Sequence, residues 1–295
     1  MRIRLFSVLL TPALLLAQGS SVGSSYLLIP SDARVAALAQ ATVADPLHFS
    51  SSFLNPAILA TSRSPEILVS HTQWVQDVRV EFLGVSAPFS FGKLGFALSN
   101  LSAGGIEARE IPGAPLSTFA AHSAVMQLMF ATSITDDVSL GTNLKYMYEK
   151  IYVDETSGYG VDLGLLYRAP VEGIFIGASL TNNGSMSGFR TTASDLPTSL
   201  QAGATYRIKG EEFDVSLNGA FVRETKTGRN RLNAATELDY DDILLFRVGY
   251  QTGYESHGIT TGLGFRYSIL NFDYSYIPWS LSLGNVHVFS IGFRL

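Results

Sequence analysis

The chain lacks cysteine, has few charged residues and has no long apolar segment after its N-terminus. None of its 295 residues is a cysteine, which excludes a disulfide framework, a thiolate metal site and an acylated lipid anchor. Only 15% of the residues are charged, and 25 acidic residues outnumber 20 basic ones. Such a balance does not suggest nucleic-acid binding. No later run reaches the roughly 18 apolar residues of a spanning helix, which excludes a helical membrane protein.

The first 19 residues have the pattern of a secretory signal peptide. Arg2 and Arg4 precede an apolar run that is too short to span a membrane, and small residues follow it. We expect cleavage after Ala17 or after Gly19. Cleavage removes two positive charges, so the formal net charge changes from −5 to −7.

Residues 20–64 differ from the rest of the chain and predict a short, partly helical N-terminal plug or hatch. An Ala-rich stretch over 31–40 predicts a helix with Ser31 or Asp32 as its N-cap. Further on, Pro56 suits the first position of a helical turn, with Asn55 extended before it.

From residue 65 to residue 295 apolar side chains recur at every second position, which predicts an all-β domain. One apolar face carries Leu140, Leu144 and Tyr146, while Asn143 and Lys145 fall on the other face. We count fourteen strands, near 66–73, 77–88, 92–103, 119–132, 137–153, 157–168, 173–184, 195–207, 212–223, 230–239, 243–252, 257–267, 269–277 and 286–295.

The pattern favours a transmembrane antiparallel β-barrel in a bacterial outer membrane over a soluble β protein. The chain ends in a strand whose alternate residues are large and apolar, and such a strand suits barrel closure against the first one. The apolar faces often end in Tyr, the strand count is even, and short turns alternate with longer connections such as 104–118 and 184–194. The predicted lipid-facing residues of the last strand are Phe289, Ile291, Phe293 and Leu295.

Residue patterns that carry enzymatic chemistry are absent from the sequence. The five His residues are scattered without ligand spacing, and no nucleophile elbow, phosphate loop or calcium loop is present. His122 and Ser123 are adjacent on a strand, so their side chains point to opposite faces. We predict no enzyme, no cofactor and no metal.

Charged residues on the polar parity of the strands are the better site candidates. They either pair with one another across neighbouring strands, or line a path and hold the N-terminal segment inside. The predicted lumen-facing charges are Lys145, Glu149, Asp162, Arg168, Arg207, Asp214, Arg247, Arg266 and Asp273.

The N-terminal segment resembles that of the PorV/PorQ group, outer-membrane proteins related to the FadL long-chain fatty acid transporters. The resemblance rests on the motifs over 31–34, 39–45 and 55–60, ahead of an all-β remainder. Leu38-Ala39 replaces the group's Met-Gly, and Ile58 replaces its Gly. The residues matching the plug or hatch motif are Asp32, Arg34, Asp45, Asn55, Pro56 and Ala57.

The resemblance implies a fourteen-stranded barrel with the N-terminal segment packed in its lumen, and it leaves three functions open. The main one is a non-enzymatic component of type IX secretion that binds secreted cargo or secretion components at 104–118 or 184–194. The alternative is a FadL-like passive transporter of a hydrophobic small molecule, with a strand kink at Pro197 or within 181–184. The third is a structural barrel with a plugged lumen. The partners expected in every case are outer-membrane lipid and no nucleic acid.

Overall fold

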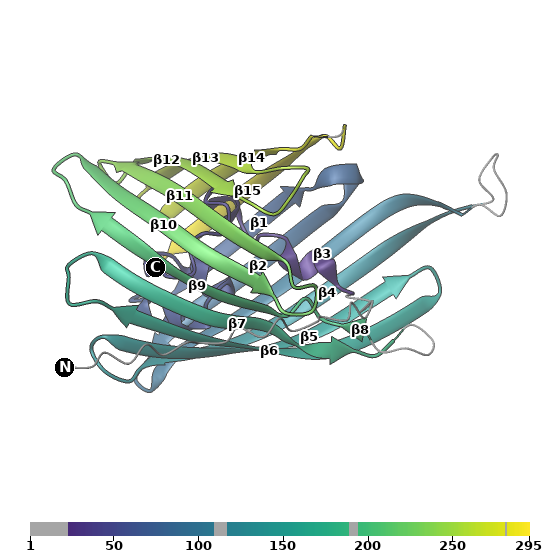
Figure 1. The fold of residues 1–295 in the computed structure, drawn as a ribbon, viewed down its shortest axis with the longest axis horizontal. Helices are drawn as coiled ribbons and strands as arrows, with labels where there is room; N and C mark the ends of the chain where they lie inside the picture. Colours follow the sequence, from purple (N-terminus) through teal and green to yellow (C-terminus); the bar gives the residue numbers. More distant parts are fainter. Residues whose placement is uncertain (1–22, 109–116, 189–193, 281) are drawn as a thin grey trace, which may run out of the picture.

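Fourteen long antiparallel strands form a closed barrel in the described part of the chain (Figure 1). The computed structural model describes residues 23–108, 117–188, 194–280 and 282–295, so the predicted signal peptide lies outside the described residues. A fifteenth strand, β8 (Ser194–Asp195), is a two-residue bridge beside β7. The long strands are β1 (Glu66–Gln73), β2 (Arg79–Phe89), β3 (Gly92–Ala108), β4 (Ser117–Ser133), β5 (Val138–Ile151), β6 (Asp154–Arg168), β7 (Ile174–Met186), β9 (Ser199–Ile208), β10 (Phe213–Glu224), β11 (Asn230–Tyr240), β12 (Leu244–Gln251), β13 (Ile259–Tyr267), β14 (Leu270–Pro278) and β15 (Asn285–Arg294).

The predicted pairing of the last strand with the first is present. β15 lies antiparallel to β1, with Ile291 opposite Val69 and Phe293 opposite Ile67. β6 pairs with β7, so the ladder of strands runs around the whole wall. Closure leaves no long unpaired edge, which the hydrocarbon core of a membrane requires.

The wall has an apolar outer face and a polar inner face, as the period-two pattern predicts. Leu144, Phe246 and Leu263 each leave about half of their surface exposed on the outer face. Residues of the opposite parity, such as Asn143 and Ser275, are fully buried inside the barrel. A closed barrel with an apolar exterior confirms the predicted outer-membrane barrel. No helix in the described ranges is long and apolar enough to cross a membrane.

The predicted strand boundaries differ most from the observed ones in two regions. The connection predicted over 104–118 is shorter, because β3 and β4 continue past Gly104 and Gly105, which lie at a register shift in their ladder. These glycines therefore belong to a bulge and not to a loop. The strand predicted from residue 195 begins at Ser199, because Leu196 turns into the barrel and packs against Met147.

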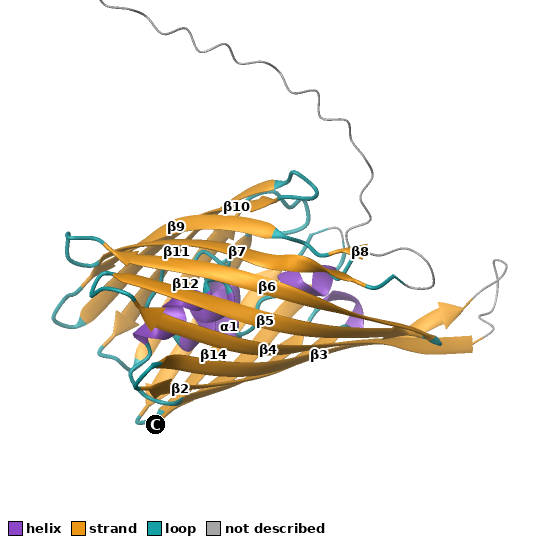
Figure 2. Cartoon of the chain, turned by 90° about the horizontal axis from the view of Figure 1, so that it is seen from below, coloured by secondary structure: helices purple, strands orange, loops and turns teal. Residues whose placement is uncertain are grey.

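The N-terminal segment lies inside the barrel (Figure 2). It contains η1 (Ser25–Leu28), α1 (Ala33–Ala37), η2 (Phe49–Phe53) and η3 (Pro56–Thr61), and we call residues 23–64 the plug. α1 is shorter than the predicted helix, since Ala39 and Gln40 adopt positive φ angles just after it. Its N-cap is Asp32, whose carboxylate accepts a hydrogen bond from the Val35 amide.

The two rims of the barrel differ in their connections. We call the rim where β1 begins and β15 ends the near rim; its turns contain two to five residues. Most connections at the opposite far rim are longer, up to the twelve residues between Met186 and Ser199. Short turns mark the periplasmic side of bacterial barrels. The near rim is therefore the periplasmic one. At the far rim, the connection between β1 and β2 contains a short helical turn, η4 (Val75–Asp77).

Candidate functional site

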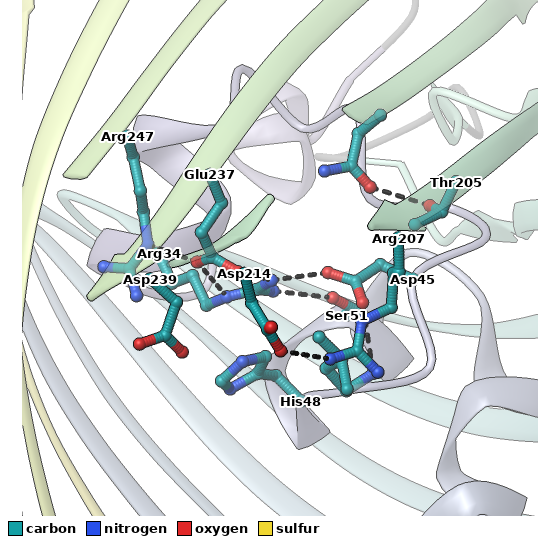
Figure 3. Close-up of polar contacts among 12 residues, drawn as sticks. Arg34, Asp45, His48, Ser51, Thr205, Arg207, Asp214, Glu237, Asp239 and Arg247 are labelled. Carbon is teal, nitrogen blue, oxygen red and sulfur yellow. Dashed lines mark hydrogen bonds and ion pairs between the residues drawn. The ribbon is translucent and has the colours of Figure 1, made fainter. Parts of the chain in front are cut away.

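Arg34 of the plug connects the plug to the barrel wall through a buried ionic network (Figure 3). Its guanidinium donates to the Asp45 carboxylate of the plug at 2.5 Å and to the Glu237 carboxylate on β11 at 2.8 and 2.9 Å. It also donates to the Ser51 hydroxyl at 3.3 Å. Burial lowers the pKa of Arg34, but Asp45 and Glu237 outweigh this effect and raise it, so the side chain stays charged. One cation therefore joins two turns of the plug to one strand.

The network continues along the wall and contains more acids than bases. Arg247 on β12 pairs with Glu237 and with Asp273 on β14, each at 2.5 Å. Asp32 at the start of α1 is also buried. Burial, and then the neighbouring Asp273 carboxylate, raise the pKa of Asp32 from 3.8 to about 6. Two arginines face four carboxylates, so Asp32 takes up a proton at a higher pH than a solvent-exposed aspartate does.

Inward-facing glycines of the wall let the plug backbone approach closely. A Cβ atom built on Gly164 of β6 would lie 2.8 Å from the Ala57 nitrogen and closer still to the Asn55 side chain. A Cβ on Gly177 of β7 would lie 2.9 Å from the Ala44 Cα. Both distances are below the 3.0 Å that real Cβ contacts keep. The glycine-rich inner face is thus shaped to the plug.

Asn55 ties η3 to the wall and to an earlier turn of the plug. Its side-chain amide donates to the backbone carbonyl oxygens of Val43 at 2.8 Å and Leu165 at 2.9 Å. Its Oδ1 accepts from the Ala57 amide at 3.1 Å and caps η3, which begins at Pro56. The extended Asn55 before a helical Pro56 agrees with the sequence prediction.

A second polar cluster lies on β5, β6 and β7, nearer the far rim. The Lys145 ammonium contacts the Asp162 carboxylate at 2.8 Å and donates to Asn182 Oδ1 at 2.6 Å. Asp162 accepts hydrogen bonds from the Asn143 side chain at 2.8 Å and from the Asn182 amide at 2.7 Å. Asn182 has a φ of 56°, in the left-handed region. The cluster holds a bulge in which Thr181 and Asn182 together face Asp162.

The plug divides the barrel lumen into separate spaces. A cavity of about 820 Å³ opens between the plug and the near rim. Two small cavities, of about 80 and 40 Å³, lie on the other side of the plug and share Leu27, Phe53 and Lys145 in their walls. The larger of these two is lined mainly by apolar side chains, among them Tyr26, Val125 and Phe82.

The nine charged residues predicted to face the lumen all lie on the inward parity, and most of them pair across strands. Arg266 contacts Asp239 at 2.6 Å, and Arg207 lies 3.8 Å from Asp214. Glu149 instead accepts a hydrogen bond from Ser24 of the plug at 2.5 Å. Arg168 has no ion pair in the described part of the chain, and its guanidinium lies over the Phe175 ring at 5.8 Å.

Sequence reasoning missed Glu237, which holds the central position of the network. Glu237 lies directly opposite Arg247 in the β11–β12 hairpin. The tight turn at Tyr240–Asp242 fixes this register, so the pair follows from the sequence once the turn is recognised. The contact between Arg34 and Glu237 has no such local signal.

Comparison with solved structures shows that the fold is similar to that of several outer-membrane β-barrels. A FadL homologue from Pseudomonas aeruginosa is 11% identical, with a TM-score of 0.59 over 89% of this chain and 97% of that one. A toluene transporter from Ralstonia pickettii is 13% identical, with a TM-score of 0.57 over 85% and 94% of the two chains. The toluene transporter TodX of Pseudomonas putida is 12% identical, with a TM-score of 0.54 over 83% and 91%. No protein-family model and no curated protein sequence matches the chain.

These similarities confirm the predicted barrel with a FadL-like fold. They lend no support to the narrower assignment to the PorV/PorQ group or to type IX secretion, because the similar structures are described as transporters of small molecules or as a FadL homologue. At such low identity they establish the fold alone.

Proposed function

We propose that the protein carries hydrophobic small molecules passively across the outer membrane. The observation that carries this proposal is an interruption of the barrel wall between β7 and β9. Their ladder stops where Thr181 faces Ser199, although β7 runs on to Met186. Because the plug fills the lumen, a solute that enters from the far rim needs a route other than straight through.

Between Ser199 and the two-residue β8, where backbone pairing with β7 resumes, side-chain contacts close the wall in place of a ladder. The Thr198 hydroxyl donates to the Asn182 carbonyl oxygen at 2.9 Å, and Leu196 packs inward with Val125 and Met147. Apolar side chains of Tyr26 and Leu27 line the space on the lumen side of this seam. An apolar solute in that space would meet membrane lipid directly once the seam opened. By this lateral route the solute passes from the lumen into the lipid, and its apolar surface is not exposed to water.

The test is uptake of radiolabelled toluene by cells that lack their own hydrocarbon transporter. Cells that make the protein should take up toluene faster than cells with an empty vector. Deletion of Asn182 removes the extra residue of the bulge, and the Asn183 side chain still points to the same face of the wall. The deletion should therefore close the seam and lower toluene uptake to the empty-vector level. Thr198→Val removes one closing hydrogen bond and should raise uptake.

Thr205→Val is the matched control, since Thr205 is equally buried but bonds to Asn218 away from the seam. It should leave uptake unchanged. Each variant is first checked for a folded barrel by its heat-dependent mobility in a gel. Uptake at the empty-vector level for both toluene and a long-chain fatty acid, with the wild-type barrel folded, would refute the proposal.

The role in type IX secretion remains a prediction from the N-terminal motifs. Half of the residues in its expected cargo contacts, 104–118 and 184–194, lie outside the described ranges. Affinity purification from gently solubilised outer membranes tests it directly. Recovery of secreted proteins that share a C-terminal β domain would favour secretion over transport.

A further inference from the structure

The cavity between the plug and the near rim, which we call the vestibule, has a positive net charge although the whole chain is acidic. Its walls carry three carboxylates, from Glu66, Asp136 and Asp137. Six cations oppose them, so the vestibule has a formal net charge of +3, whereas the whole chain has −5. The six cations are Arg63, Lys93, Arg168, Arg207, Lys209 and Arg294.

Most of these cations lack an acidic partner. Among the described residues, Arg63, Lys93, Arg168 and Lys209 have no carboxylate within 4.0 Å, in contrast to the arginines of the buried network. Only the other two are paired: Arg294 with Glu66 at 3.6 Å, and Arg207 with Asp214 at 3.8 Å. Unpaired cations gathered in one concave space repel each other, and an anionic ligand would relieve that repulsion.

The cations are spread around the mouth and do not converge on one point. Lys93 lies on β3 and Arg168 at the end of β6, three strands away, which is about 14 Å along the wall. Arg207 on β9 lies two strands beyond β6, about 10 Å further. A single carboxylate or phosphate cannot contact all of them. An extended chain with several carboxylates can.

We propose that the vestibule binds an acidic peptide segment of a periplasmic protein. The near rim faces the periplasm, the plug forms the floor, and a volume of about 820 Å³ admits several residues of an extended peptide. The site lies on the opposite side of the plug from the β7–β9 seam. The proposal therefore stands or falls independently of transport.

The test measures binding of a fluorescein-labelled peptide of alternating Asp and Gly to the full-length protein in lipid nanodiscs. Fluorescence anisotropy should show saturable binding at low salt that weakens at least about tenfold in half-molar salt, since screening acts on exposed charges. The triple variant Lys93→Gln/Arg168→Gln/Lys209→Gln should weaken binding by about tenfold or more. These side chains are not part of the buried network, so the barrel should still fold.

The matched control removes cations from the far rim. Arg79→Gln/Lys150→Gln/Arg223→Gln deletes the same number of exposed charges there and should leave peptide binding unchanged. Equal weakening by both triple variants would overturn the proposal, because it would reveal attraction by overall charge. So would displacement of the peptide by millimolar inorganic phosphate, which would reveal a small-anion site. Binding of phosphatidylglycerol vesicles without binding of the peptide would overturn it in favour of a lipid surface.

Discussion

At the scale of single residues, Arg34 decides whether the plug stays attached to the wall. Arg34→Met would leave Asp45 and Glu237 buried without a cation they now share. Removing one member of a buried ion pair typically costs about 3–5 kcal/mol. We expect the free energy of unfolding, measured by urea titration in lipid vesicles, to fall by about that amount.

The double variant Arg34→Met/Asp45→Asn separates charge from packing. Glu237 keeps its ion pair with Arg247, so Asp45 is the carboxylate that Arg34→Met leaves without a cation among the described residues. The double variant removes that charge and should recover part of the lost stability. Arg223→Met on an exposed part of β10 should change the free energy of unfolding by no more than about 0.5 kcal/mol. A double variant no more stable than Arg34→Met would mean that the network contributes through shape and not through charge.

Asp32 gives the plug a pH dependence whose sign follows from its pKa. Burial, and then Asp273, raise the pKa of Asp32 from 3.8 to about 6 in the folded protein. The folded state therefore binds this proton more readily than the unfolded state does. The resulting stabilisation is complete below pH 3.8 and is lost as the pH rises through about 6. A shift of this size corresponds to about 3 kcal/mol at most.

Asp32→Asn should remove this dependence without losing the helix cap, because Asn caps as well as Asp. At neutral pH the variant should be more stable than the wild type, and the advantage should vanish in acid. His48 acts in the opposite sense, since burial and then Arg34 lower its pKa. For this reason the measurement is the difference in melting temperature between wild type and variant across pH. Parallel curves would exclude Asp32 as the group responsible.

The sequence predicts which side chains face the lumen and which of them meet across a tight hairpin, but not which wall residues the plug contacts. Alternation places Arg247 and Asp273 inside, because one slip of register would turn the whole strand outward. The contact of Arg34 with Glu237 joins residues 203 positions apart and depends on the depth of the plug in the barrel. Neither the period-two alternation of the strands nor the residues of their turns determine that depth. The glycines that receive the plug fix it instead.

At the scale of secondary-structure elements, the strands follow the sequence pattern closely and the short helices do not. Strands such as β5 and β13 combine a strict period of two with clear turns, and their ends are predicted to within a few residues. α1 keeps five residues, because tertiary contacts of Ala37 and Ala39 with β13 and β12 bend the chain early. The apolar Leu196 fits the pattern of a strand, but its side chain packs inside the barrel and lies before the start of β9.

The fit between plug and wall gives a prediction for Gly164 of β6. Gly164→Val would drive side-chain atoms into Asn55 and Pro56, so the plug must move or the wall must bend. We expect the melting temperature to fall and η3 to become accessible to a periplasmic protease. Gly219→Val is the matched control, since a Cβ at Gly219 meets nothing within 4 Å. Equal protease resistance in both variants would mean that the glycine face does not set the position of the plug.

At the scale of the whole molecule, the plug should be what keeps the barrel closed to ions. In an eight-stranded barrel the inward-facing side chains fill the interior. A barrel of fourteen strands is wider, so its wall alone leaves room for water. Deleting residues 20–64 removes Arg34 and Asp32, while the Arg247 pairs with Glu237 and Asp273 remain on the wall and become hydrated. We expect a steady conductance in planar lipid bilayers for this deletion and almost none for the wild type. Arg34→Met should lie between the two, with brief openings as the plug detaches. If the deletion variant folds and still does not conduct, the inner side chains of the wall seal the lumen, and the network around Arg34 serves stability alone.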